Sequence, residues 1–327
     1  MESGGFGRRF RFVGTFVTAH VESIDTDPHP RDGDSSAGER ASVKPPIALA
    51  HIAAALSLFV ALYIATFLAA GYGAALAGIF LNQWVTLLSV SVATFATVAI
   101  FEEGRWRLGL FVPSAVAARE FLIGCAAAVL LIASADGLVL LTTGLRHVAG
   151  NGFPWIELIA VYLPAVFHEE LLFRGYPFQK LWRTNRLVAV LLTSVVFAAL
   201  HGGNNAVSWL AMVNLFFAGI LLALAYARYE RLWFPIGIHL AWNLLSGPVL
   251  GYNVSGFVAS ETVLRTVGRG TPWLTGGLFG IEGSVWIGIV ELVAIALLLR
   301  GVVLGRLALR NPVLVSESQA TTANRTS

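Results

Sequence analysis

The sequence predicts an all-α protein, a bundle of about eight membrane-spanning helices with both chain ends on the cytoplasmic side. Two observations on composition support this class: 56% of the 327 residues are hydrophobic, and only 13% are charged. Soluble domains have about 25% charged residues. The third observation is a mean hydropathy of +0.73, with long apolar runs separated by short basic segments.

Eight apolar segments are candidate spans, because a helix needs about 20 mainly apolar residues to cross a bilayer. In chain order they are residues 47–70, 79–101, 119–143, 154–178, 186–201, 207–227, 232–250 and 281–305. The stretch from Asp25 to Pro46 has too few apolar side chains for a packed core, so we expect residues 1–46 to form a disordered cytoplasmic tail. Residues 311–327 form a second polar tail.

The arginines and lysines predict how these spans are oriented, because basic residues accumulate on the cytoplasmic side of a membrane. With the N-terminus inside, the cytoplasmic segments carry most basic residues, namely Arg8, Arg9, Arg11, Arg31, Arg40, Lys44, Arg105, Arg107, Arg119, Lys180, Arg183, Arg186, Arg228, Arg231, Arg300, Arg306, Arg310 and Arg325. The opposite side keeps Arg146, Arg265 and Arg269. An even number of spans fits this distribution.

The same features exclude several classes of function. The basic residues form no single stripe, so a nucleic-acid partner is not expected. Cys125 is the single cysteine, which excludes disulfide frameworks and thiolate metal clusters. We find no internal repeat of the kind that inverted-repeat transporters have.

The region between the tails divides into three parts by sequence. Residues 47–153 are expected to form the N-terminal membrane helices, residues 154–250 a core that carries several ionisable side chains, and residues 251–310 a glycine-rich loop with the last membrane helix. The glycine-rich stretch 274–283 is interpreted either as a re-entrant or capping loop or as a flexible connector, and the sequence favours neither.

The run from Phe167 to Gly175 places three ionisable groups in an apolar segment. Such groups are costly inside a membrane and usually serve a function. Glu170 and Arg174 have the i, i+4 spacing, acid first, that favours an ion pair. Glu169 is left as the freer carboxylate, and partial desolvation would suit it to take a proton from water as a general base.

Two further i, i+4 pairs lie in later segments, Phe197 with His201 and His239 with Asn243. The Phe197 ring is expected to pack beneath the His201 imidazole. His239 and Asn243 could donate hydrogen bonds to an oxyanion. Equally, Glu169 or Glu170 with His201 and His239 would supply zinc ligands. The sequence leaves both schemes open. His168 lacks a histidine partner four residues on, so the HExxH spacing is absent and we expect a structural role for it.

The ordered set of Glu169-Glu170 with Arg174, Phe197 with His201, and His239 with Asn243 resembles the three motifs of the CPBP family. This family comprises CAAX-prenyl proteases and bacteriocin-processing or immunity proteins, also called Abi proteins. The resemblance covers roughly residues 154–250, and a weaker likeness to a glycine-rich element of some bacterial members covers residues 276–283.

This resemblance implies an intramembrane endopeptidase, a glutamate protease or a metalloprotease. It implies that Glu169 activates water with His201, that Glu170 and Arg174 support the site, and that His239 with Asn243 stabilises the transition state. If zinc is the cofactor, the implied ligands are Glu170, His201 and His239.

The main hypothesis is therefore a multi-pass protease of a prokaryotic cell membrane that hydrolyses a peptide bond of a membrane-associated protein or peptide. Its expected partners are membrane lipid and that substrate. Two alternatives are a non-catalytic scaffold or immunity protein of the same family and an ion- or proton-coupled transporter. The cost of burying every polar motif residue argues against a scaffold.

Overall fold

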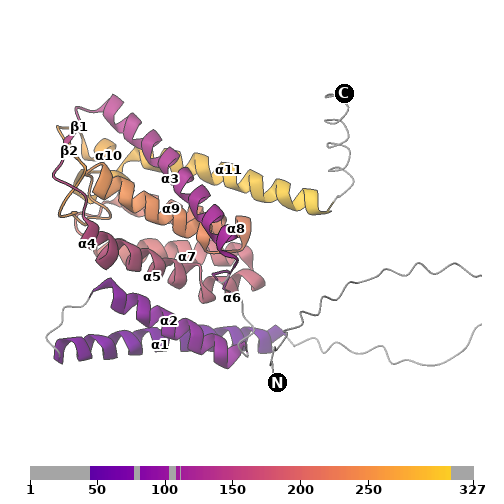
Figure 1. Ribbon diagram of the computed structural model, residues 1–327. Helices are drawn as coiled ribbons and strands as arrows, with labels where there is room; N and C mark the ends of the chain where they lie inside the picture. Colours follow the sequence, from indigo (N-terminus) through magenta and orange to yellow (C-terminus); the bar gives the residue numbers. More distant parts are fainter. Residues whose placement is uncertain (1–44, 77–81, 103–107, 111, 311–327) are drawn as a thin grey trace, which may run out of the picture. The chain divides into compact units, whose positions relative to one another are not determined.

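Helices dominate the computed structural model, which describes residues 45–76, 82–102, 108–110 and 112–310 (Figure 1). The described residues belong to one unit, Lys44–Ser327. The longer helices are α1 (Pro45–Leu76), α2 (Gln83–Phe101), α3 (Ser114–Thr142), α5 (Leu163–Phe173), α6 (Tyr176–Thr184), α7 (Arg186–Leu200), α8 (Trp209–Tyr229), α9 (Trp233–Leu244) and α11 (Val285–Arg310). The predicted all-α class is confirmed. The predicted tails, 1–46 and 311–327, lie almost wholly outside the described residues.

Short elements join these helices. The helical turns are α4 (Trp155–Glu157), α10 (Pro272–Thr275), the π-helical η1 (Leu158–Tyr162) and η3 (Leu245–Val249), and the 3₁₀ turns η2 (His201–Gly203), η4 (Gly277–Phe279) and η5 (Ile281–Gly283). Strands β1 (Arg146–Ala149) and β2 (Leu264–Val267) pair antiparallel, with Arg146 opposite Val267.

Five of the described helical segments are long and apolar enough to cross a membrane. They are Leu49–Leu76, Gln83–Phe101, Ser114–Thr142, Arg186–Gly203 and Trp209–Tyr229. Many of their large apolar side chains are exposed, such as Leu68 on α1 and Leu130 on α3. Lipid tails are a suitable solvent for such surfaces, so the chain is a membrane protein. The predicted total of eight spans and the orientation remain predictions.

The predicted fourth span is divided in the structure. Helix α5 ends at Phe173, and the separate helix α6 starts at Tyr176. A Cβ atom on Gly175 would lie 2.1 Å from the Leu171 carbonyl oxygen, and Pro177 cannot donate a backbone hydrogen bond. The Gly-Tyr-Pro sequence therefore ends the helix where the apolar run alone suggested that it continues to residue 178.

Helices α3 and α9 pack backbone against backbone near the centre of the bundle. A Cβ atom on Gly124 would lie 2.4 Å from the Phe234 carbonyl oxygen, and one on Gly237 would lie 2.2 Å from the Phe121 carbonyl oxygen. Only glycine permits this approach, which is a common way to join helices in membranes. The contact holds α9, and with it His239, at a fixed position.

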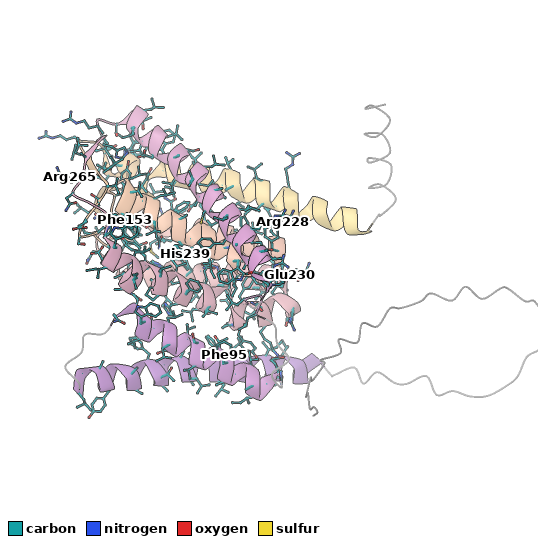
Figure 2. All side chains as sticks on the ribbon, viewed as in Figure 1. Phe95, Phe153, Arg228, Glu230, His239 and Arg265 are labelled. Atoms are coloured by element: carbon teal, nitrogen blue, oxygen red, sulfur yellow. The ribbon has the colours of Figure 1, made fainter. Side chains whose placement is uncertain are left out.

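The two ends of the helices differ in character. At one end lie α6 and the turn between α8 and α9; we call this the basic end because its described residues include Arg119, Lys180, Arg183, Arg186, Arg228, Arg231 and Arg300. At the other end lie residues 143–154 and 251–284, which we call the cap. Figure 2 shows Arg265 and Phe153 at the cap, Arg228 and Glu230 at the basic end, and His239 between them.

The cap is an ordered structure attached to α3. Asp136 near the end of α3 accepts hydrogen bonds from Tyr252 Oη at 2.7 Å and from His147 Nε2 at 3.0 Å. Thr266 on β2 lies 3.1 Å from the other His147 nitrogen, Nδ1. The glycine-rich stretch 274–283 belongs to the same ordered region, because the Gly256 backbone N–H donates to the Phe279 carbonyl oxygen at 2.9 Å. Its role as a re-entrant or capping loop remains a prediction.

Candidate active site

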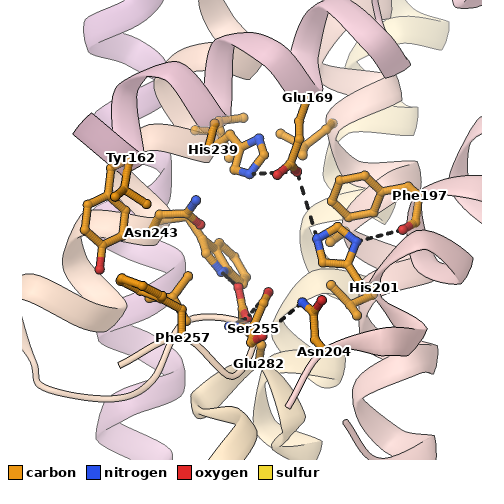
Figure 3. A pocket seen from close by; sticks show the side chains of 18 of the residues that line it. Tyr162, Glu169, Phe197, His201, Asn204, His239, Asn243, Ser255, Phe257 and Glu282 are labelled. Atoms are coloured by element: carbon orange, nitrogen blue, oxygen red, sulfur yellow. Dashed lines mark hydrogen bonds and ion pairs between the residues drawn. The ribbon is translucent and has the colours of Figure 1, made fainter. Parts of the chain in front are cut away.

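The three sequence motifs come together from three helices. Glu169, Glu170 and Arg174 lie at the end of α5, Phe197 and His201 at the end of α7, and His239 with Asn243 on α9 (Figure 3). Helix α7 is fixed at its start because Asn185 Oδ1 accepts the Val188 backbone N–H at 3.1 Å. It ends at Leu200, where the Gly202-Gly203 turn follows His201.

Glu169 faces both imidazoles. Its Oε2 atom lies 3.7 Å from His239 Nε2 and 4.0 Å from His201 Nε2. The exposed fraction of the Glu169 side chain is 22%, but Oε2 itself is buried and has no hydrogen-bond partner among the described residues. A carboxylate oxygen in this state needs a donor, and both distances are long enough for a water molecule to bridge the groups.

The His201 ring is held by its own helix. Its Nδ1 atom donates to the Phe197 carbonyl oxygen at 2.8 Å, since a carbonyl only accepts. The Phe197 ring packs against the imidazole with centroids 4.6 Å apart, as the spacing predicts. The Arg174 guanidinium also packs on the Phe197 ring, with its central carbon 5.0 Å from the ring centroid. With Nδ1 occupied, Nε2 of His201 points toward Glu169.

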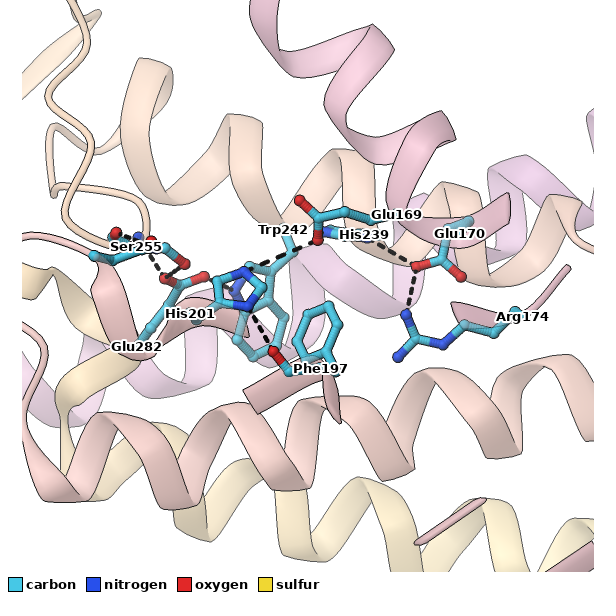
Figure 4. Close-up of polar contacts among 10 residues, drawn as sticks. Glu169, Glu170, Arg174, Phe197, His201, His239, Trp242, Ser255 and Glu282 are labelled. Atoms are coloured by element: carbon cyan, nitrogen blue, oxygen red, sulfur yellow. Dashed lines mark hydrogen bonds and ion pairs between the residues drawn. The ribbon is translucent and has the colours of Figure 1, made fainter. Parts of the chain in front are cut away.

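A buried chain of charges orients His239 (Figure 4). Its Nδ1 atom lies 2.8 Å from Glu170 Oε1, and the same oxygen accepts from Arg174 Nη1 at 3.1 Å. Glu170 and Arg174 are 0% and 1% exposed, so each charge requires the other. Arg174 Nη2 also donates to the Gly219 carbonyl oxygen at 3.2 Å. Nε2 of His239 is thereby directed at Glu169.

Glu169, His201 and His239 line a cavity of about 210 Å³. Its lining comes from α2, η1, α5, α7, α8, α9 and the cap: Gln83, Val161, Tyr162, Ala165, Glu169, Phe197, His201, Asn204, Leu215, Ala218, Leu221, Leu222, Ile238, His239, Trp242, Asn243, Val254, Ser255, Phe257 and Glu282. Asn243 lies one turn beyond His239 on the same helix, so both predicted oxyanion donors border one space. Glu170 and Arg174 do not appear in this lining.

The cap contributes a site residue that sequence reasoning missed. Glu282 Oε2 accepts from the Ser255 backbone N–H at 2.6 Å and from its hydroxyl at 2.7 Å, while Oε1 accepts from Trp242 Nε1 at 3.1 Å. Asn204, beyond His201, donates to the Ser255 carbonyl oxygen at 3.0 Å. A carboxylate inside the glycine-rich stretch was a signal available in the sequence, but its partners are distant along the chain.

The zinc set suggested by sequence does not form. Glu170 contacts Nδ1 of His239. On the opposite, Nε2 side of that ring lies Glu169, and His201 lies near Glu169. The 3.7 and 4.0 Å spacings around Glu169 exceed the roughly 3.3 Å expected between ligands on a tetrahedral zinc with bonds of about 2.0 Å. Within the described chain, no group of three or more His, Cys, Asp or Glu side chains is placed to hold a metal ion. The residues therefore do not fit zinc.

His168 lies outside this cluster. Its Nε2 atom lies 2.9 Å from Tyr63 Oη on α1, and the two rings stack with centroids 5.8 Å apart. This interaction joins α5 to α1, in keeping with the structural role expected for His168.

Comparison with known proteins supports the same region. Residues 151–245 match the model of the Rce1-like family, described as type II CAAX prenyl endopeptidase Rce1-like. The UPF0177 protein YvdC of Lactococcus lactis subsp. lactis (strain IL1403) is 32% identical over 82 residues, which cover 25% of this chain and 30% of that protein. No solved structure gave a significant match.

The matched region runs from just before α4 to the end of α9, and so contains all three motifs and the cluster around Glu169. The resemblance seen in the motifs is thus confirmed by an independent comparison. Over residues 151–245, this chain is therefore similar to the Rce1-like family.

Proposed function

We propose that the protein is an intramembrane endopeptidase in which Glu169 activates a water molecule for attack on a peptide carbonyl. One observation carries this proposal: a buried carboxylate oxygen without a hydrogen-bond partner among the described residues lies within 4.0 Å of two imidazole nitrogens in a cavity. A charged group is costly at such a place unless it is used. The Rce1-like match supports a protease of this kind.

The hydrogen bonds of the two imidazoles suggest where the water lies. Nδ1 of His201 carries its proton, so the neutral ring offers the Nε2 lone pair to the cavity. A water molecule can donate one hydrogen to Glu169 and the other to His201, which leaves an oxygen lone pair for the carbonyl. Both ring nitrogens of His239 face carboxylate oxygens, which act as acceptors, so we assign a proton to each nitrogen.

The reaction then follows in balanced steps. Glu169 takes a proton as the water oxygen bonds to the carbonyl carbon, and the carbonyl oxygen becomes negative. His239 Nε2–H and the Asn243 amide stabilise that oxyanion. Glu169 returns the proton to the peptide nitrogen as the C–N bond breaks. Because the residues do not fit zinc, no step is assigned to a metal.

We further propose a substrate that is a segment of a membrane-associated protein or peptide, in contact with membrane lipid. The cavity lies among membrane helices, and the family match is to prenyl endopeptidases. A prokaryotic cell membrane is the proposed location. The low lysine content, Lys44 and Lys180 alone, is typical of GC-rich genomes, and YvdC comes from a bacterium.

The test is peptide cleavage by the full chain reconstituted in liposomes. The probes are a quenched-fluorescent farnesylated CAAX peptide and the same peptide with a palmitoyl chain in place of the farnesyl group. We expect Glu169→Ala, His201→Ala and His239→Ala to lose roughly 10²–10⁴-fold in kcat. The control Glu261→Ala changes an exposed glutamate of the cap and should match wild type.

Unchanged turnover in Glu169→Ala would overturn the mechanism. A second arm adds a zinc chelator, and we expect activity to persist. Loss of activity that zinc restores would require a metal site and would contradict the assignment of the chemistry to these side chains alone.

A further inference from the structure

The cavity extends from the catalytic cluster toward the cap. Ala165 and Tyr162 lie one and two turns before Glu169 on the same helical segment, and both line it. Phe257 of the cap and Gln83, the first residue of α2, also line it. Figure 3 shows Tyr162 and Phe257 together on the side of the cavity away from Glu169.

The basic end is closed behind the cluster. Arg174, Tyr176 and Phe178 are at most 1% exposed. Gln179 Nε2 donates to the backbone oxygens of Leu108 and Arg174, at 3.1 and 3.0 Å, which joins α6 to the segment before α3. A peptide arriving from this end would have to displace these packed side chains.

Two other hollows lie nearer the basic end. A polar one is lined by Gln179, Trp182, Arg183, Arg186, Tyr226 and Glu230. An apolar groove between α3, α5 and α9 is lined by Val112, Ser114, Ala117, Ala118, Phe121, Leu163, Phe167, Trp233 and Leu240. Among described residues, neither shares a lining residue with the catalytic cavity. Neither offers an open route to Glu169.

The distribution of charge indicates which side of the membrane the cap faces. The basic end carries most of the described arginines and lysines. The cap carries Arg146, Arg265 and Arg269. Because basic residues remain in the cytoplasm, the cap is expected on the extracytoplasmic side.

We infer that the catalytic cavity opens to the extracytoplasmic side, through the space between Gln83 and Phe257. This inference rests on the proposed protease function and specifies its substrate class. The substrate is an extended segment of a membrane protein, or of a lipid-anchored polypeptide, that lies on the extracytoplasmic side next to the membrane. A C-terminal peptide that remains in the cytosol would not reach Glu169.

The first test measures access without relying on activity. In a Cys125→Ala background, single cysteines are placed at Ala165 in the cavity, at Leu278 on the cap and at Thr184 at the basic end. Intact cells are treated with a membrane-impermeant thiol reagent. We expect Leu278→Cys and Ala165→Cys to react in intact cells, and Thr184→Cys to react only after lysis. Reaction of Ala165→Cys only together with Thr184→Cys would overturn the inference.

The second test separates access from catalysis. Sealed right-side-out and inside-out vesicles receive the palmitoyl peptide made impermeant by a polyanionic tail, with and without detergent. We expect cleavage by right-side-out vesicles alone until detergent opens the others. Cleavage by sealed inside-out vesicles alone would contradict extracytoplasmic access. No cleavage in detergent would instead count against the proposed protease, while the cysteine test still decides the access.

Discussion

Two adjacent glutamates of one helix occupy opposite environments. Glu170 is fully buried and joined to Arg174 and His239, whereas Glu169 is 22% exposed and borders the cavity. Successive helical residues point about 100° apart, so one turn of α5 presents a dry face and a wet face. The comparison shows how one motif can supply both a fixed structural charge and a carboxylate free to exchange a proton.

Among the substitutions considered, we expect one on the dry face to lower the stability of the fold most. Glu170→Gln leaves the Arg174 charge buried without its carboxylate, and breaking such a pair costs about 3–5 kcal/mol. The melting temperature in detergent micelles should fall sharply, and His239 should lose its orientation and the enzyme its activity.

A double-mutant cycle with Arg174→Met sharpens this prediction. Removing both charges leaves neither one uncompensated, so the double variant should be more stable than Glu170→Gln. If the two losses simply add, the buried pair does not hold the dry face together.

A substitution on the wet face should lower kcat without lowering the stability of the fold. Asn243→Ala removes a proposed oxyanion donor, and loss of such a donor costs roughly 10²–10³-fold in kcat. Michaelis–Menten kinetics should show this in kcat with KM little changed, and the melting temperature should stay near that of wild type. An effect confined to KM would mean that Asn243 binds substrate without stabilising the transition state.

Much of this comparison could be predicted from sequence because it depends on helical spacing. The i, i+4 positions of Glu170 with Arg174 and of Phe197 with His201 predicted contacts that the structure contains. The break at Gly175 was missed, since the apolar residues continue through Phe178 and hydropathy alone does not register a backbone clash. Glu282 was missed because Ser255 and Trp242 reach it through the folding of the cap, which no local pattern encodes.

Glu282→Gln tests the cap at the border of the wet face. An amide has one acceptor oxygen in place of two, so it cannot accept from both Ser255 and Trp242 as the carboxylate does. Leaving a buried donor unpaired costs about 1–3 kcal/mol, and we expect KM to rise about tenfold as the cap loosens. Glu261→Gln, an exposed change in the same cap, is the matched control. Equal kinetics in the two variants would remove Glu282 from the site.

Among these variants, Tyr252→Phe should change stability and turnover least. It deletes the hydroxyl that donates to Asp136 at the attachment of the cap to α3, a bond worth about 0.5–1.5 kcal/mol. Thermal melting should shift by a few degrees, and turnover should change less than twofold. A large loss of activity would mean that the attachment of the cap governs the catalytic cluster.

The most direct test of the division between the two faces is a paired measurement on isosteric variants. Glu169→Gln and Glu170→Gln are purified together, and kcat and melting temperature are determined for each. We expect Glu169→Gln to melt like wild type but to lose roughly 10²–10⁴-fold in kcat, and Glu170→Gln to lose stability as well as activity. A wild-type kcat for Glu169→Gln would rule out Glu169 as the general base.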